Sequence, residues 1–227
     1  MKREVGIFLS VALTVSFMVV TRAKAEEHQK SGKAPSADTL WDSLVDGNKR
    51  FIDGEPIHHD LVSPRHTLAN NQHPLVAVLS CSDSRVPPEV VFDQGLGDLF
   101  VVRVAGNSSE PIVIGSLEYA VKHLGTVMIV VLGHQSCGAV TAACSDEKIP
   151  TSNLEALVQP IAPSCKVAKQ KHSDESLLDV AVKDHVGRTA QSLLTHSQVL
   201  RHAHDKGKLA FVEAYYSLDS GVVTRLH

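Results

Sequence analysis

The chain has 227 residues, of which 43% are apolar, which is enough for one sizeable globular domain and disfavours two large ones. Its 22 basic and 25 acidic residues are interspersed and give a net charge of −3 at pH 7, so no basic stripe indicates a nucleic-acid partner. Most of the 13 histidines lie in polar segments, where solvated surface is the simplest interpretation.

Residues 1–25 have the pattern of a secretory signal peptide. Lys2 and Arg3 precede an apolar run at residues 5–20, and the Ala-Lys-Ala sequence at 23–25 is typical of a cleavage site. An uncleaved membrane anchor is the alternative, because the apolar run nearly spans a bilayer. The polar sequence that follows favours cleavage. We therefore expect an exported, periplasmic protein with no membrane segment after cleavage.

The mature chain is predicted to be one domain. Residues 26–37 are polar, contain glycine and proline, and are predicted to be a disordered lead-in to a single domain at 38–227. Apolar residues then recur at helical spacing, so the domain begins with a helix that Ser36 or Asp38 can cap and that ends at about Gly54.

The rest of the chain alternates between apolar runs rich in β-branched residues and segments with helical periodicity. This alternation indicates an α/β fold, in which helices flank a mostly parallel sheet with right-handed crossovers. We expect the core strand order 2-1-3-4 plus an extra edge strand. After a loop at 55–73, which can contain one helical turn, the expected strands are 75–80, 99–105, 127–132, 208–218 and 221–226. The expected helices are a short one from 87, then 108–124 with Ile112 facing inward, 138–144, 153–161, 175–196 and 197–206.

Two of these strands end in chemically reactive side chains. The strand at 75–80 is followed by Cys81, Asp83 and Arg85, and the strand at 127–132 is followed by His134 and Cys137. In the order 2-1-3-4 the first and third strands are neighbours whose connections run to opposite sides of the sheet. A crevice forms between their carboxyl ends. Cys81 and His134 are therefore expected to face each other there.

Two cysteines and one histidine form the donor set of a zinc site that keeps one coordination position open. Cys81, His134 and Cys137 are the candidate ligands. Asp83 can accept the proton of a zinc-bound hydroxide while Arg85 holds its carboxylate in a bidentate pair. Alternatively, Asp83 can move onto the metal and fill the fourth position, which closes the site.

Other interpretations of these cysteines fit less well. A structural zinc site commonly has four Cys or His ligands, and Cys81 has no short-spaced companion. A redox dithiol is disfavoured because the sequence contains no Cys-x-x-Cys. Cys144 and Cys165 remain for a disulfide, but the sequence does not decide whether they pair.

These residues resemble the signatures of the β-class carbonic anhydrases. Cys81-Ser82-Asp83-Ser84-Arg85-Val86 resembles the first signature of that family, and His134-Gln135-Ser136-Cys137-Gly138 resembles the second. Residues 92–107 and 115–121 also follow the family, and residues 46–51 and 214–221 extend the resemblance to nearly the whole mature chain.

The resemblance implies an enzyme that reversibly hydrates carbon dioxide to bicarbonate and a proton with a zinc-bound hydroxide. It assigns one Zn²⁺ per subunit to Cys81, His134 and Cys137, with Asp83 and Arg85 as the catalytic pair. A non-catalytic zinc-binding scaffold and a hydrolase of carbon disulfide or carbonyl sulfide on the same fold remain alternatives.

The resemblance also implies the substrate pocket and the assembly. Gln72, Phe100 and Tyr119 match substrate-binding positions, and Ala105 lies where plant-like members carry valine. Tyr119 and His123 match a pair that is proposed to pass protons to solvent. The family fold implies a homodimer or a dimer of dimers, with an N-terminal helical arm around the partner and the pockets at the subunit boundary.

Overall fold

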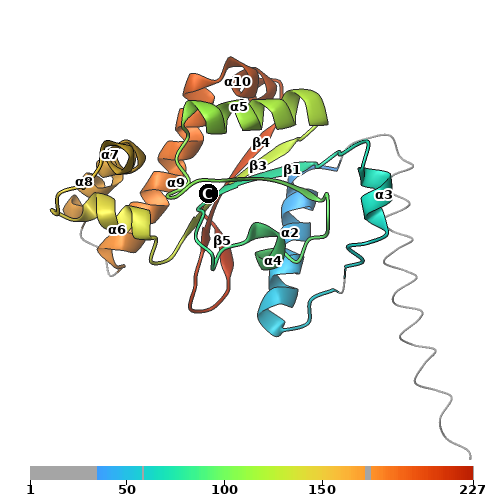
Figure 1. Ribbon diagram of the computed structural model, residues 1–227, viewed down its shortest axis with the longest axis horizontal. Helices are drawn as coiled ribbons and strands as arrows, with labels where there is room; N and C mark the ends of the chain where they lie inside the picture. Colours follow the sequence, from blue (N-terminus) through green and yellow to red (C-terminus); the bar gives the residue numbers. More distant parts are fainter. Residues whose placement is uncertain (1–34, 58, 172–174, 227) are drawn as a thin grey trace, which may run out of the picture. The chain divides into compact units, whose positions relative to one another are not determined.

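The computed structural model describes residues 35–57, 59–171 and 175–226 (Figure 1). The expected signal peptide at 1–25 and most of the expected lead-in at 26–37 lie outside the described residues. In the described part of the chain, no helix is long and apolar enough to cross a membrane. Residues from Leu40 onward form one compact unit, which contains the whole sheet.

The sheet has five strands in the order β2-β1-β3-β4-β5. The first four are parallel, and β5 pairs antiparallel to β4. This arrangement confirms the predicted α/β class, the core order 2-1-3-4 and the extra edge strand. The strands are β1 (Val76–Ser80), β2 (Leu99–Arg103), β3 (Met128–His134), β4 (Ala210–Tyr216) and β5 (Val223–Arg225).

The helices lie close to their predicted ranges, with one addition and two corrections. Residues 162–170 form a helix that periodicity did not predict. Its second residue is Pro163, which a first helical turn accepts. The helix expected at 108–124 starts later, at Pro111, and ends in a π-helical turn. The helices are α2 (Ala37–Asp53), α3 (Pro64–Leu68), α4 (Pro88–Val91), α5 (Pro111–Tyr119), η1 (Ala120–Leu124), α6 (Gly138–Cys144), α7 (Ser152–Val158), α8 (Ala162–Gln170), α9 (Leu177–His196) and α10 (Gln198–Asp205).

The central strands β1 and β3 are buried along their whole length. Alternate residues such as Leu79 and Val131 pack in one core cluster with Leu117 of α5, Val186 of α9 and Leu200 of α10. These helices therefore cover one face of the sheet, as the ribbon shows (Figure 1). Such burial on both sides explains why these strands read as continuous apolar runs in the sequence.

Helix α2 packs its apolar face against its own subunit. Trp41 contacts Phe92 edge-on, with ring centroids 6.5 Å apart. Asn48, which is buried, donates to the carbonyl oxygens of Val91 and Gly221 at 3.0 and 2.8 Å. The helix is thereby fixed to α4 and to the turn before β5. By contrast, Ile112 is 86% exposed, so its predicted inward orientation is wrong.

Helix α9 lies unusually close to β3. A Cβ atom at Gly133 would lie 2.6 Å from Cγ2 of Val186 and 2.8 Å from Cγ1 of Val182, so only glycine fits at this point of the strand. Gly133 directly precedes His134. The close packing therefore places α9 beside the end of the strand that carries a predicted metal ligand.

Cys144 and Cys165 form a disulfide, with Cα atoms 5.1 Å apart. The bond joins the last residue of α6 to α8. This answers the question that the sequence left open. Cys81 and Cys137 are both free and buried.

Candidate metal centre

The structure brings the three predicted metal ligands together. Cys81 follows β1, His134 is the last residue of β3, and Cys137 precedes α6. The two strands are parallel neighbours, with Ser80 opposite Leu132, so both end at the same edge of the sheet. The ligand atoms all lie within 4.8 Å of one another, all three residues are buried, and the two Sγ atoms are 4.0 Å apart.

The hydrogen bonding of His134 fits a metal ligand. Its Nδ1 lies 2.8 Å from the carbonyl oxygen of Gln135, which can only accept, so Nδ1 carries the proton and Nε2 has a free lone pair. Nε2 is buried and has no hydrogen-bond partner among the described residues. An unpaired buried nitrogen is costly, and a cation would satisfy it. The donor set and this orphaned nitrogen therefore fit Zn²⁺.

The two thiols influence each other strongly. The hydrogen bond from Cys137 lowers the pKa of Cys81, and the amide of Gly106, which donates to Cys81 Sγ at 3.3 Å, lowers it further. The pKa of Cys137 is raised because Cys81 accepts its proton in a hydrogen bond and because a second negative charge would stand beside the first. One of the two cysteines is thus ready to bind a cation, and the second must lose its proton when the cation enters.

Asp83 and Arg85 form a two-point ion pair beside this cluster. Arg85 donates from Nε to Oδ1 at 2.9 Å and from Nη2 to Oδ2 at 2.7 Å. These hydrogen bonds keep the pKa of Asp83 far below its usual range, even though partial burial opposes them. Oδ2 lies 3.9 Å from Nε2 of His134. The carboxylate therefore stays ionised next to the cluster and is held by Arg85.

Arg103 holds the loop that carries Cys81 and Asp83, a role that the sequence analysis missed. Its Nε donates to the carbonyl oxygen of Cys81 at 3.0 Å and its Nη2 to that of Asp83 at 2.5 Å. Arg103 ends β2 and lies opposite Ser80 of β1. The sequence does show a charged residue, Arg103, at the end of a strand. Only the pairing register of β1 and β2 shows that this residue lies beside the loop that carries Cys81.

Gln135 holds the second ligand loop and was also missed. Its side chain donates to Oδ2 of Asp219 at 2.6 Å and accepts from the hydroxyl of Ser217 at 3.2 Å and the backbone N–H of Asp219 at 3.1 Å. The next residue, Ser136, has a φ of +53°, so the loop needs such support. Nothing in the sequence links Gln135 to residues more than 80 positions away.

The predicted substrate and relay residues lie elsewhere in the chain. Gln72, Tyr119 and His123 line a cavity of about 610 Å³ that none of the three candidate metal ligands lines. The ring of Tyr119 lies 6.5 Å from that of Phe100 and 5.3 Å from that of His123, centroid to centroid. Phe100 is in register with Ala77. Since Ala77 precedes Cys81 by four residues of strand, Phe100 lies about 13 Å from the metal end of the sheet.

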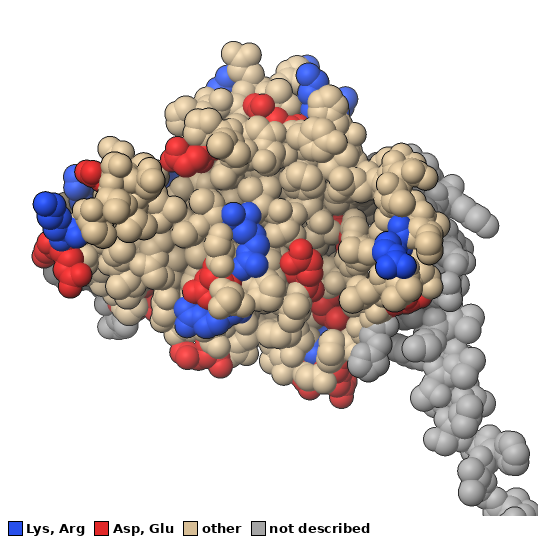
Figure 2. Space-filling model, viewed as in Figure 1, with Lys and Arg blue, Asp and Glu red and all other residues tan. Residues whose placement is uncertain are grey.

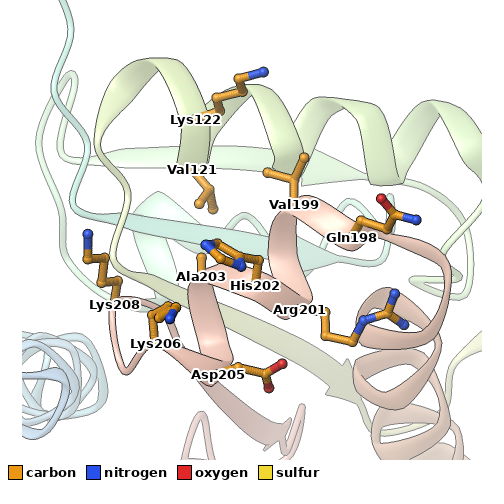
Figure 3. A pocket seen from close by; sticks show the side chains of 10 residues that line it. All are labelled: Val121, Lys122, Gln198, Val199, Arg201, His202, Ala203, Asp205, Lys206 and Lys208. Atoms are coloured by element: carbon orange, nitrogen blue, oxygen red, sulfur yellow. The ribbon is translucent and has the colours of Figure 1, made fainter.

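Cavity size alone does not locate the metal centre. A cavity of about 670 Å³ between η1 and α10 is lined by Lys122, His202 and Lys208 among others, and by none of the predicted site residues (Figure 3). Basic and acidic side chains are interspersed over the face of the molecule seen in Figure 2. The chemistry of the strand ends, rather than the surface, therefore defines the candidate site.

The fold and the site together define an α/β protein with a candidate three-ligand metal centre at the carboxyl ends of two central strands. The family model described as carbonic anhydrase matches residues 76–223. Carbonic anhydrase 2 of Mycobacterium tuberculosis is 41% identical over 185 residues, which cover 80% of this chain and 88% of that protein. The carbonic anhydrase of Mycolicibacterium smegmatis is 40% identical over 187 residues, which cover 81% and 90%.

Solved structures of β-carbonic anhydrases have the same fold as this chain. The β-carbonic anhydrase CcaA has a TM-score of 0.64 at 26% identity, covering 82% of this chain and 87% of its own. A structure described among two tetrameric β-carbonic anhydrases from Sordaria macrospora has a TM-score of 0.66 at 22% identity, covering 83% and 97%. The chain therefore belongs to the β-class carbonic anhydrases and is an enzyme of that class.

Proposed function

We propose that the protein catalyses the reversible hydration of carbon dioxide to bicarbonate and a proton, with one Zn²⁺ per subunit held by Cys81, His134 and Cys137. The observation that carries the proposal is the convergence of these three buried ligand atoms, one of them an imidazole nitrogen without a partner among the described residues, beside an ionised Asp83. Membership of the carbonic anhydrase family supports it.

Asp83 and Arg85 have separate roles in the proposed reaction. When bound, Zn²⁺ would act as a Lewis acid that lowers the pKa of a water molecule and so provides a nucleophile at neutral pH. Asp83 accepts a hydrogen bond from the reacting water at Oδ2, the oxygen that lies 3.9 Å from His134 Nε2, and thereby orients its lone pair. Arg85 keeps this carboxylate ionised and correctly aimed through two hydrogen bonds.

The substrate pocket is proposed to need a second subunit. Gln72 precedes β1 and Phe100 lies in the first half of β2, so both belong to the end of the sheet away from Cys81. Among the described residues, β2 has a strand on one side only, and Ile112 on the neighbouring α5 is exposed. A symmetric contact between two subunits along this edge would bury the free side of β2 and Ile112. It would also bring Phe100 and Tyr119 of one subunit to the metal end of the other.

Assays of the purified mature protein test the function. We expect stoichiometric zinc and carbon dioxide hydration in stopped-flow measurements that rises with pH. A protein that holds zinc but shows no hydration would instead be a scaffold. Hydrolysis of carbon disulfide or carbonyl sulfide that is faster than carbon dioxide hydration, assayed side by side, would indicate a hydrolase of these gases instead.

Export is proposed from the N-terminal sequence. The basic, apolar and small-residue regions of 1–25 have the order of a cleaved signal peptide. The Cys144–Cys165 disulfide supports an oxidising compartment such as the periplasm. N-terminal sequencing of the protein from a periplasmic fraction should begin at Glu26, and recovery of the intact chain from the cytoplasm would contradict export.

A further inference from the structure

A buried histidine outside the cluster is connected to it through a single residue. His185 of α9 is 3% exposed, and its Nε2 lies 2.8 Å from the carbonyl oxygen of Gly106. Because a carbonyl oxygen only accepts, Nε2 carries the proton and donates it. The backbone N–H of Gly106 in turn donates to Cys81 Sγ at 3.3 Å. Gly106 therefore joins α9 to a candidate metal ligand.

The backbone of Gly106 has a conformation that another residue would not adopt easily. Its φ is +77°, and a Cβ atom there would lie 2.6 Å from Cδ1 of Ile161 and 3.1 Å from Cβ of Ala139. Asn107, the next residue, has a φ of +45°. Two consecutive left-handed residues need support from the surrounding structure. The hydrogen bond from His185 provides such support at the carbonyl between them.

His185 is held as a neutral donor. Burial lowers its pKa, and the nearby Asp184 and Arg188 act on it in opposite directions. Its Nδ1 is buried without a hydrogen-bond partner among the described residues. A buried histidine with an unpaired ring nitrogen costs more free energy than an apolar residue of similar size. The hydrogen bond from Nε2 to Gly106 offsets part of this cost, and it is shorter than the 3.3 Å contact of Nε2 with the Ser108 hydroxyl.

We propose that His185 is a positioning residue for the metal-binding thiolate of Cys81: it fixes Gly106 so that the Gly106 amide donates to Sγ. Such a hydrogen bond fixes the position of Sγ and interacts favourably with the negative charge of a thiolate that holds a cation. Helix α9 also lies against β3 at Gly133, the residue before His134, so the same helix contacts the surroundings of two candidate ligands. This inference rests on the metal site proposed above.

Zinc affinity of the full protein, measured by competition with a chromophoric chelator, tests the inference. In His185→Leu, which keeps the volume and removes the donor, we expect the zinc dissociation constant to rise about 10- to 100-fold. The thiolate-to-metal charge-transfer band of the cobalt-substituted protein should shift as well. In His185→Gln, whose amide can donate to the same carbonyl, both quantities should return toward the wild-type values.

Thr189→Val is the matched control. Thr189 is buried one turn further along α9, and its hydroxyl lies 3.5 Å from Nε2 of His185, which is a long contact, so its loss should change zinc affinity less than about threefold. If His185→Leu does not fold, His185→Asn replaces it, because its shorter amide does not reach Gly106 and the same losses are expected.

The outcomes separate the two proposals. Wild-type zinc affinity and an unshifted cobalt band in His185→Leu would overturn the positioning role and leave the metal site intact. Equal losses in His185→Leu and Thr189→Val would also overturn it, because packing alone would then explain both. A wild-type protein that binds no zinc would overturn the proposed function itself.

Discussion

The imidazole of His134 donates from Nδ1 to the backbone carbonyl oxygen of Gln135, 2.8 Å away. This hydrogen bond between adjacent residues decides which ring nitrogen is free to bind a cation. It requires the carbonyl of Gln135 to turn toward the ring, and the side chain of Gln135 holds that orientation through Asp219 and Ser217. The turn between β4 and β5 thus controls the geometry of a ligand on β3.

Replacing Gln135 should therefore weaken metal binding. In Gln135→Ala the three side-chain hydrogen bonds are lost, and we expect zinc affinity to fall about 10-fold or more. Chelator competition gives the dissociation constant. Gln191→Ala, an exposed glutamine on α9, is the control and should have no effect. Unchanged affinity in Gln135→Ala would mean that the loop keeps its conformation without this side chain.

Replacing Asp83 should strongly reduce turnover but not metal binding. Asp83→Asn keeps the shape and removes the negative charge that accepts the hydrogen bond of the reacting water, so we expect hydration to fall by about 10²- to 10⁴-fold. Zinc content should remain stoichiometric. The hydration rate of Arg85→Lys should lie between those of the wild type and Asp83→Asn, because lysine cannot make the two-point contact with Asp83. Full activity of Asp83→Asn would contradict the role that we propose for it.

Mixed subunits should test whether the pocket is shared. Cys81→Ser removes a metal ligand and Gln72→Ala removes a substrate-binding residue, so each homodimer should be inactive. If the pocket combines Gln72 of one subunit with Cys81 of the other, each mixed dimer regains one complete site. Co-expression with two different affinity tags would isolate it. A mixed dimer as inactive as both parents would place Gln72 and Cys81 in the same subunit's pocket.

His123 should matter only when the buffer is weak. Its ring lies 5.3 Å from that of Tyr119, and both residues line the same cavity. If they pass the proton to solvent, His123→Ala should lower turnover in weak buffer, while concentrated imidazole restores it. His66→Ala, an exposed histidine on α3, is the control. The same rate in weak buffer for His123→Ala and the wild type would reject the relay.

Asp93 should make the protein sensitive to acid. Burial would raise its pKa, but the amide of Ile57 and the guanidinium of Arg50 outweigh burial and lower it. A carboxylate with a lowered pKa stabilises the folded state above its unfolded pKa of about 3.9, and this stability is lost as the pH falls through the lower folded value. Asp93→Asn, which tolerates the φ of +46° found here, should lower the free energy of unfolding by about 1.5–3 kcal/mol at pH 7.

Urea unfolding at pH 7 and pH 3 measures this effect. The difference between Asp93→Asn and the wild type should shrink at the lower pH, because pH 3 lies below the unfolded pKa of about 3.9 and the unfolded wild-type chain then takes up a proton, which favours unfolding. Asp53→Asn is the control, since Asp53 pairs with Lys49 on an exposed face of α2, where an ion pair contributes at most about 1 kcal/mol. A difference that is the same at both pH values would show that charge is not the cause.

The sequence by itself determined the alternation of strands and helices and the identity of the candidate ligands. The apolar runs and the helical periodicity are local patterns, whereas the order 2-1-3-4, which makes strands one and three neighbours, was an expectation about topology that the sheet confirmed. Cys81, Asp83, Arg85, His134 and Cys137 follow those strands directly, so their meeting depended only on topology.

The tertiary structure alone decided which residues hold those ligands in place. Arg103, Gln135 and His185 act through hydrogen bonds to backbone or side chains between about 20 and 85 positions away, and such pairings depend on register and packing rather than on any local pattern. The orientation of Ile112, the pairing of Cys144 with Cys165 and the separation of Phe100 from the metal end were decided in the same way. Each depends on distances between elements, which a single sequence does not contain.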